Sequence, residues 1–227
     1  MSVGKPMALD WNVAQYISAG TIDEPLVPVA TCEYWIAQPL YYLHGLKGAL
    51  PQIWVREGVY ERLVRAAQNL PSRYRLVLLD GWRPKSIQQF LFSSFREKVA
   101  SANPTMSDEE VELQTLTFAA HPSDDPQCPS PHITGGAIDV TLADADGTLL
   151  DMGSEVDEIS ERSWTAAPVP VLQTERRKDL LETMVRAGFT NLPSEWWHFD
   201  YGNWVWAWYS NHYAALYGPI AGPTQED

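Results

Sequence analysis

Two short segments of the chain contain the residue types of a metal site. The first, SPHITGGAID at 130–139, carries His132 and Asp139 around two adjacent glycines. Asp139 lies inside the alternating run AIDVTL, which predicts a strand over 137–142. An ionised aspartate in an apolar strand is costly unless it is paired or binds a metal. The bend that Gly135 and Gly136 permit could bring His132 back over Asp139, although a loop histidine and a turn-capping aspartate would give the same pattern.

The second segment, EWWHFD at 195–200, supplies another carboxylate and another imidazole. Its aromatic residues favour a strand, in which side chains three positions apart point to opposite faces. Glu195 and His198 can therefore converge only if Glu195 lies on the turn before the strand, and Pro193 and Ser194 are typical of such a turn. A core histidine packed beside two tryptophans is the alternative interpretation.

In combination these residues fit the chemistry of a catalytic zinc ion. Such an ion takes three protein ligands, here His132, Asp139 and His198, and leaves a fourth position for water. It lowers the pKa of that water, and a carboxylate that is not a ligand, here Glu195, accepts the proton. The oxyanion that forms needs a fixed cation, for which Arg83 in the motif DGWRP is a candidate. An ion pair with the aspartate of the same motif is the alternative role for Arg83.

The chain resembles the M15 zinc peptidases in three motifs that occur in the family's order. SPHITGGAID is similar to the family pattern SxHxxGxAxD, and EWWHF is similar to its ExxH element. DGWRP is similar to the DGYRP element of the D-alanyl-D-alanine dipeptidases, the subfamily that includes the VanX-type enzymes of vancomycin resistance. The segment DMGSEVDEISERS also resembles the stretch that follows the metal motif there, so the resemblance covers about residues 55–200.

The resemblance implies a reaction and a set of site residues. The implied substrate is a small dipeptide, D-alanyl-D-alanine, whose two charged ends both need recognition. The resemblance implies that His132, Asp139 and His198 bind one Zn²⁺ per chain. It implies that Glu195 is the general base and that Arg83 stabilises the tetrahedral intermediate. It also implies that Ser130 contacts the substrate and that Asp157 binds the free ammonium group. An exposed loop acid is the alternative interpretation of Asp157.

Three departures from the family pattern bear on the substrate. Trp82 replaces the tyrosine of DGYRP. The N-terminal segment matches poorly, so Tyr34, Tyr41 and Tyr42 are alternatives for the tyrosine that the family places at the substrate site. The aromatic tail beyond Asp200 is longer than in the best-known members.

Predicted helices and strands must hold these residues in place. Apolar residues at helical spacing predict a helix over 57–70. A second helix is expected to start with Pro84 as its first residue. A capping box of Ser107 and Glu110 predicts the start of a third. A further helix over 174–189 is closed by Gly188. Strands are predicted over 76–79 and 137–142, and the aromatic run 195–209 favours β-structure.

This order of elements predicts a single α+β domain over 1–227. We expect a central antiparallel sheet with helices packed around it and a zinc site in a cleft, as the resemblance to hedgehog-like and D,D-peptidase folds implies. Residues 1–55 would form a covering segment of loops and short strands, and 201–227 an aromatic C-terminal extension.

The composition narrows the classes of function. The 227 residues carry a net charge of −13, which repels a phosphate backbone and an anionic membrane surface, so neither nucleic acid nor membrane is an expected partner. The N-terminus lacks the basic start and apolar run of a signal peptide, and no stretch approaches ~18 apolar residues. We therefore expect a cytoplasmic protein without a membrane-spanning helix.

Together with the resemblance, these observations predict a zinc-dependent D-alanyl-D-alanine dipeptidase that hydrolyses D,D-dipeptides through a metal-activated water. A D,D- or L,D-carboxypeptidase or endopeptidase on peptidoglycan peptides would use the same chemistry on larger substrates. The absence of a signal peptide and the covering N-terminal segment favour the smaller substrate. A zinc-stabilised binding module without turnover is a third hypothesis, and it has no use for a general base at Glu195.

Overall fold

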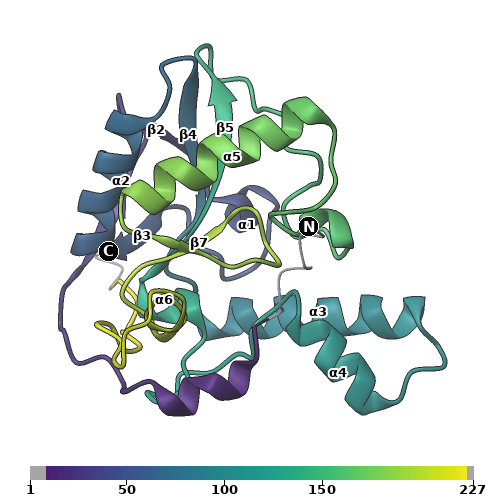
Figure 1. Ribbon diagram of the computed structural model, residues 1–227. Helices are drawn as coiled ribbons and strands as arrows, with labels where there is room; N and C mark the ends of the chain where they lie inside the picture. Colours follow the sequence, from purple (N-terminus) through teal and green to yellow (C-terminus); the bar gives the residue numbers. More distant parts are fainter. Residues whose placement is uncertain (1–8, 224–227) are drawn as a thin grey trace.

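A five-stranded sheet forms the centre of the computed structural model, which describes residues 9–223 (Figure 1). The strand order is β2–β4–β5–β7–β6, with β2 parallel to β4 and the other neighbouring pairs antiparallel. Strands β1 and β3 form a separate antiparallel pair. The strands are β1 (Leu26–Val29), β2 (Trp35–Ala37), β3 (Ile53–Arg56), β4 (Tyr74–Asp80), β5 (Ala137–Asp144), β6 (Thr190–Asn191) and β7 (His198–Asp200).

Helices cover one face of this sheet and gather at one of its ends. In Figure 1, α2 and α5 lie across the sheet, and α3, α4, α6 and the N-terminal 3₁₀ helix η1 lie below it. The α-helices are α1 (Leu40–Leu43), α2 (Glu57–Asn69), α3 (Lys85–Ala102), α4 (Asp108–Leu116), α5 (Val171–Arg186) and α6 (Trp204–Tyr209). The 3₁₀ helices are η1 (Trp11–Tyr16), η2 (Pro131–Thr134) and η3 (Glu161–Ser163). The predicted α+β fold with a mainly antiparallel central sheet is confirmed.

Most predicted elements lie where their periodicity placed them. Helix α2 matches the predicted 57–70 to within one residue. The capping box forms, since the Ser107 hydroxyl accepts the Glu110 backbone N–H at 3.3 Å and the Glu110 carboxylate accepts the Ser107 N–H at 2.7 Å. Gly188, at φ 104°, follows the end of α5 as expected. Pro84 differs from the prediction: its extended ψ of 142° makes it the N-cap, and α3 begins one residue later.

The aromatic run 195–209 contains a strand only in its first part. Strand β7 covers 198–200, whereas 204–209 forms helix α6. Gly202, at φ 76°, turns the chain after the strand, and the Asn203 side chain then accepts the Trp206 backbone N–H at 2.9 Å. This N-cap starts a helix in which Trp204 and Trp206 are buried, so local capping and tertiary packing override the preference of the aromatic residues for strands. The prediction of β-structure for this second part was wrong.

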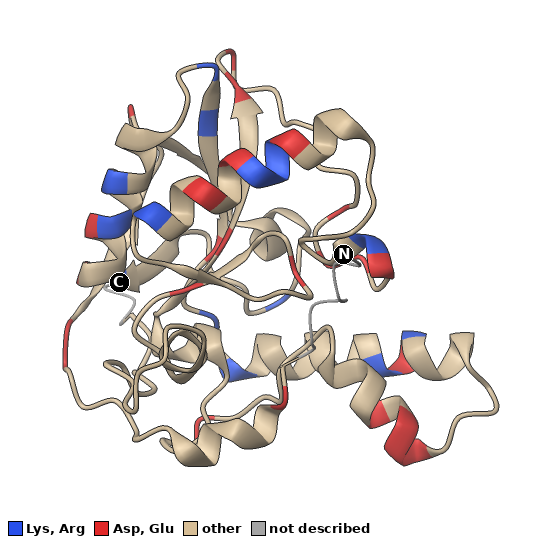
Figure 2. Ribbon diagram, viewed as in Figure 1, with Lys and Arg blue, Asp and Glu red and all other residues tan. Residues whose placement is uncertain are grey.

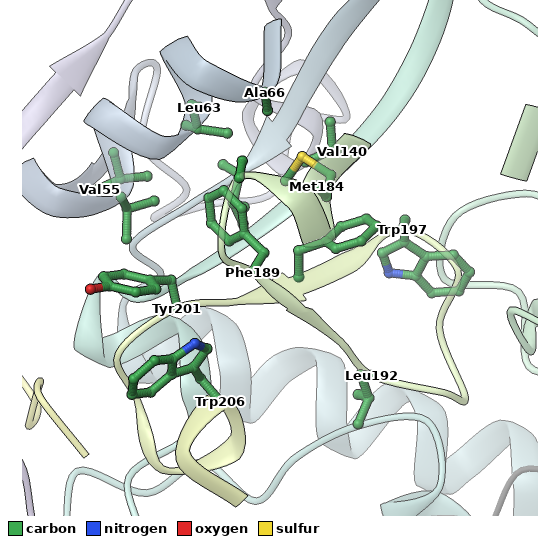
Figure 3. Packing of buried hydrophobic residues seen from close by; sticks show 14 of the residues in the cluster. Val55, Leu63, Ala66, Val140, Met184, Phe189, Leu192, Trp197, Tyr201 and Trp206 are labelled. Carbon is green, nitrogen blue, oxygen red and sulfur yellow. The ribbon is translucent and has the colours of Figure 1, made fainter. Parts of the chain in front are cut away.

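The main core lies between the sheet and helices α2 and α5 (Figure 3). Ile138, Val140 and Leu142 alternate along β5 and are fully buried in this core, as the sequence pattern predicted. In Figure 3, Met184 of α5 lies close to Val140, and Leu63 of α2 belongs to the same buried cluster. Burial of one such side chain contributes about 1.5–3 kcal/mol. This apolar face therefore holds β5 in place and leaves the opposite face of the strand for polar side chains.

The C-terminal extension packs against the loop that carries His132. The backbone N–H of Ile220 donates to the carbonyl oxygen of Ile133 at 3.1 Å. The indole N–H of Trp82 lies 3.1 Å from both the Ile133 and the Ile220 carbonyl oxygens. Trp82, which departs from the family pattern, thus ties the extension to the loop.

Gly202→Ala is expected to destabilise the fold through this extension. Gly202 has φ +76°, and an added Cβ would lie 2.5 Å from the Tyr217 ring, which is buried. The added methyl group forces a shift of the ring, at a cost of about 1–3 kcal/mol on top of the backbone strain. The free energy of unfolding from urea titration measures the loss.

Gly45→Ala is the matched control for this substitution. Gly45 has a similar φ of +73°, but nothing lies within 4 Å of the added Cβ. It should show only the backbone strain of a left-handed residue, about 1–2 kcal/mol. Equal losses for the two variants would contradict the role given to the Tyr217 contact.

Charge is distributed unevenly over the surface elements. The chain has 29 Asp and Glu against 16 Lys and Arg. Figure 2 shows acidic residues gathered on α4 and residues of both signs mixed along α5.

Among residues 9–223, no helix has the length and apolar character needed to cross a membrane. The cytoplasmic location stays a prediction from the sequence.

Candidate metal centre and active site

Three elements bring His132, Asp139 and His198 together. Asp139 of β5 lies directly opposite His198 of β7 in the antiparallel register, so the two side chains share one face of the sheet. His132 lies in η2, whose C-cap is Gly135 in the left-handed conformation with φ 69°. A side chain larger than hydrogen at Gly135 would be strained there and would also meet Leu26 at 2.6 Å. The bend that the glycine permits carries the chain from η2 into β5.

The donor atoms of these residues have the spacing of a tetrahedral metal site. His198 Nδ1 lies 3.1 Å from Asp139 Oδ1, His132 Nε2 lies 3.3 Å from His198 Nδ1, and His132 Nε2 lies 3.5 Å from Asp139 Oδ2. Ligands about 2.0–2.2 Å from a tetrahedral Zn²⁺ are separated by about 3.3–3.6 Å. All three residues are buried, and together they form a group that could hold a metal ion.

The hydrogen bonds of both imidazoles leave lone pairs directed into this group. His132 Nδ1 lies 2.7 Å from the carbonyl oxygen of Gly81, which can only accept, so Nδ1 carries the ring proton. His198 Nε2 lies 3.1 Å from Asp200 Oδ1, which also accepts a side-chain amide of Asn203, so Nε2 is the donor. The two remaining nitrogens face each other as acceptors. Two lone pairs and a carboxylate at this separation repel one another unless a cation lies between them, so the residues fit a metal ion.

The electrostatics of the cluster also favour a bound positive charge. Burial and the Arg83 guanidinium hold the pKa of His132 well below its ordinary value, so this ring is neutral. Burial lowers the pKa of His198 too, but the carboxylates of Asp200 and Asp139 outweigh it and raise the pKa well above the ordinary value. Without a metal, a proton on His198 therefore supplies the positive charge up to a pH well above the ordinary imidazole pKa, and metal binding must displace it.

Glu195 lies on the turn before β7, as predicted. Its backbone N–H donates to the Leu192 carbonyl at 3.0 Å, and its own carbonyl accepts the His198 N–H at 3.2 Å. Its carboxylate lies 3.8 Å from His198 Nδ1, beside the donor cluster. Burial raises the pKa of Glu195 to about 8. The carboxylate is therefore a stronger base than an exposed glutamate and is suited to accept a proton near neutral pH.

Arg83 is held by four side chains at the start of α3. Its Nε donates to Asp80 at 2.8 Å and its Nη1 to Gln88 at 2.7 Å. Its Nη2 donates to Tyr41 at 3.1 Å and to Asp139 at 3.2 Å. The ion pair with Asp80 that the sequence offered as an alternative is present, and it orients the guanidinium toward the cluster. Arg83 is buried, so its charge acts in a medium of low dielectric constant.

Of the three tyrosines that the sequence left open, Tyr41 lies in the site. Its hydroxyl donates to Asp157 at 3.0 Å and accepts from Arg83. Asp157 lies in the left-handed conformation with φ 62°, and burial raises the pKa of its carboxyl group. Both side chains border the same cavity as the donor cluster. Ser130 does not join them: it is buried, and its hydroxyl bonds to the backbone of Ser123 instead.

These side chains enclose a small cavity of about 30 Å³. A cavity needs about 10–15 Å³ by this measure to hold one water, so only a few atoms fit unless its walls move. Trp11 of η1 closes one side, and its indole N–H donates to the Leu116 carbonyl at 2.8 Å. The N-terminal segment therefore contributes two walls of the cavity, Trp11 and Tyr41.

Three supporting residues were not predicted from the sequence. Asp200 could have been found, because it lies two positions after His198 and so on the same face of a strand. Gln88 follows Arg83 by five positions and lies in the first turn of α3, and nothing in the sequence distinguishes it from the other glutamine there. Trp11 gives no signal in the sequence, since it reaches the cavity only through the tertiary fold.

Asp200→Ala is expected to weaken metal binding by about 10–100-fold, the usual cost of losing an outer-shell partner of a metal-binding histidine. Asp200 fixes the His198 ring at 3.1 Å and is fully buried. Asp200→Asn should cost less, because an amide oxygen can still accept the ring proton. Competition with a chromophoric chelator measures the Zn²⁺ affinity of both variants. An unchanged affinity in a folded Asp200→Ala protein would contradict this role.

Comparison with known proteins gives consistent matches. The M15 peptidase family profile described as D-ala-D-ala dipeptidase matches residues 52–216. A protein of Synechocystis named D-alanyl-D-alanine dipeptidase is 34% identical, with 90% of this chain and 94% of that protein aligned. A protein of the same name from Escherichia coli is 32% identical over 57% of this chain and 56% of that protein. Among solved structures, the vancomycin resistance D,D-pentapeptidase VanY, in complex with Zn(II), matches over 91% of this chain and 97% of that one, with 15% identity and a TM-score of 0.45.

Proposed function

Because the chain belongs to the M15 peptidase family, in the group described as D-Ala-D-Ala dipeptidases, we propose that it hydrolyses D-alanyl-D-alanine in a zinc-dependent reaction. The observation that carries this proposal is the donor cluster, whose inward-facing lone pairs and carboxylate are 3.1–3.5 Å apart beside a buried base. One Zn²⁺ per chain would be held by His132, Asp139 and His198. Zinc with an open position lowers the pKa of a water molecule and polarises a carbonyl group.

Glu195 and Arg83 have complementary roles in this reaction. Glu195 takes the proton from the attacking water and passes it to the nitrogen of the leaving D-alanine, for which its raised pKa of about 8 is suited. A guanidinium has five N–H donors, and the contacts to Asp80, Gln88, Tyr41 and Asp139 use four of them. The fifth is free to donate to the oxyanion of the tetrahedral intermediate.

Asp157 provides the negative charge for the substrate's ammonium group. It borders the cavity together with the donor cluster, and Tyr41 orients its carboxylate. A free amine at this position gains a charge-assisted hydrogen bond that a peptide nitrogen cannot make. The sequence also gave Ser130 a contact with the substrate; its hydroxyl proton is used by the Ser123 carbonyl, so Ser130 can donate to a substrate only if that bond breaks.

The cavity has a volume of about 30 Å³, so its walls must move to admit even a dipeptide. A dipeptide needs the smaller movement, which supports it over the larger substrates of the alternative hypotheses. The arrangement also supports turnover over simple zinc-dependent binding, because a buried base and a buried cation are costly features that binding alone does not need. We place this reaction in the cytoplasm, as the sequence predicted.

The test is release of free D-alanine from D-Ala-D-Ala by the zinc-loaded protein, with L-Ala-L-Ala and N-acetyl-D-Ala-D-Ala as controls. We expect turnover of the D,D-dipeptide alone, its loss with a chelator, and its return with added Zn²⁺. Faster hydrolysis of cross-linked peptidoglycan fragments than of the dipeptide would favour the endopeptidase alternative. No chelator-sensitive hydrolysis of any peptide would overturn the proposal.

A further inference from the structure

The C-terminal segment 216–222, which we call the strap, has no helix or strand of its own and joins two parts of the donor cluster. At one end, the backbone N–H of Tyr217 donates to the carbonyl oxygen of Gly202 at 2.8 Å, two positions after the end of β7. Further along the strap, the N–H of Ile220 donates to the Ile133 carbonyl oxygen of η2 at 3.1 Å. Strand β7 and helix η2 each carry one histidine of the donor cluster. The strap therefore connects the two segments that supply the imidazoles.

The last carbonyl groups of η2 depend on partners from outside this helix. A 3₁₀ helix of four residues leaves its final carbonyls without intrahelical partners, and a buried carbonyl needs one. The Ile133 carbonyl accepts the N–H of Ile220 and the indole N–H of Trp82, each at 3.1 Å. The Thr134 carbonyl accepts Arg56 Nε at 2.8 Å. These carbonyls belong to the two residues after the cluster histidine, so their partners also hold its backbone.

The strap also holds the two side chains that make these contacts. The indole N–H of Trp82 is shared between a carbonyl of η2 and the carbonyl of Ile220, at 3.1 Å from each. Gly222 lies so close to the six-membered ring of the same indole that an added Cβ would overlap with it. Arg56 is buried, and its Nη2 donates to the Gly218 carbonyl at 3.1 Å. Trp82 and Arg56 are thus two bridges between the strap and η2.

The orientation of the His132 ring depends on the same region. Its Nδ1–H donates to the Gly81 carbonyl at 2.7 Å, and its backbone carbonyl accepts the N–H of Arg83 at 3.4 Å. Trp82 lies between these two residues in the chain. By holding the Trp82 indole, the strap therefore also holds the segment that orients the ring.

We propose that the strap is a positioning element of the metal centre, which keeps His132 in the geometry of a ligand. The inference rests on the metal site of the proposed function and does not depend on the hydrolytic reaction. A loop that is free to move presents its histidine correctly for only part of the time, and the apparent Kd for the metal rises in inverse proportion to that fraction. The family profile matches only up to residue 216, so the strap lies beyond the part of the chain that the profile describes.

Two substitutions loosen the strap and leave the three ligands intact. Trp82→Phe keeps an aromatic ring and removes the N–H that bridges the strap and η2. Gly222→Ala places a methyl group against the indole, so either the ring or the strap must shift. Each variant should bind Zn²⁺ about tenfold more weakly, as expected if the histidine is correctly placed for about a tenth of the time. Competition with a chromophoric chelator measures the affinity of the full-length proteins.

Trp35→Phe is the matched control for general damage to the fold. Trp35 also loses one indole hydrogen bond, to the Ala30 carbonyl at 3.0 Å, but it lies in β2 at the edge of the sheet. This variant should have a lower unfolding temperature and an unchanged zinc affinity. A role of the strap in stability alone would not separate these two readouts.

The double variant Trp82→Phe/Gly222→Ala tests whether the two residues act through one contact. A phenyl ring lacks the outer indole atoms that the added methyl group would meet. In the Trp82→Phe background, Gly222→Ala should therefore cost less than about threefold in zinc affinity, because residues in contact do not act additively.

Native zinc affinity in both folded single variants would overturn the inference, and so would an equal loss of affinity in Trp35→Phe. Losses that multiply fully in the double variant would overturn the strap as a unit, since Trp82 and Gly222 would then act separately. A native protein that binds zinc tightly but does not hydrolyse D-Ala-D-Ala would overturn the proposed reaction and leave the strap intact. A native protein that binds no zinc would overturn both.

Discussion

Replacement of Glu195 by glutamine is expected to lower kcat at least about 100-fold while the protein keeps its zinc. The glutamine has nearly the same volume, so it fits the same buried position on the turn before β7. It cannot accept a proton from water or return one to the leaving amine. Glu195 lies 3.8 Å from His198 Nδ1, outside the donor cluster, so the metal affinity should change little.

Two measurements on the same sample test this prediction. Metal analysis should give equal zinc content for the native protein and Glu195→Gln, and steady-state kinetics should place the loss in kcat. Glu182→Gln is the matched control, because Glu182 is a partly exposed residue of α5 paired with Lys178 and Arg186. Near-native turnover by Glu195→Gln would show that another group is the base, and a loss of zinc would show that Glu195 is a ligand.

The metal cluster is the part of the site that the sequence indicated most directly. The alternation of AIDVTL placed Asp139 on the face opposite the core, and the glycines after His132 explained how the chain could return. The proximity of the two side chains depends on strand pairing: His198 lies opposite Asp139 because β5 and β7 pair in one particular register. Local pattern identified the residues, and only the tertiary fold could bring them within 3.5 Å.

The walls of the cavity could not be predicted in the same way. Tyr34, Tyr41 and Tyr42 were equivalent in the sequence, and Tyr41 was selected by a hydrogen bond to Asp157 across 116 positions of the chain. Trp11 reaches the cavity from η1, and nothing in its neighbours marks it. Such contacts depend on how distant segments pack, which periodicity does not encode.

The helix at 204–209 illustrates a second limit. Its composition favours a strand, and the decisive features are a glycine in the left-handed conformation and the Asn203 cap. Both were present in the sequence, but aromatic content outweighed them in the prediction. The supporting carboxylate Asp200 lies two positions before Gly202, so the end of β7 holds the His198 ring of the donor cluster and also starts the change of direction.

His132→Ala is expected to abolish both metal binding and activity, which makes it the most damaging single change in the site. Two ligands remain, and the affinity for Zn²⁺ should fall by more than the about 10–100-fold that an outer-shell partner costs. The carboxylate of Asp139 then keeps His198 and Arg83 as hydrogen-bond partners. Activity should fall to the level of the native protein with excess chelator.

A thermal measurement tests this loss without relying on activity. Saturating zinc at about 100 times its Kd should stabilise the native protein by about 2.7 kcal/mol, because the ion binds the folded state. The same addition should leave the unfolding temperature of His132→Ala unchanged. His212→Ala serves as the control, since His212 is exposed and stacks on Trp206 away from the cluster, and it should keep the full zinc response. A zinc response in His132→Ala equal to that of the native protein would mean that the ion is held elsewhere, and the assignment of the donor cluster would fail.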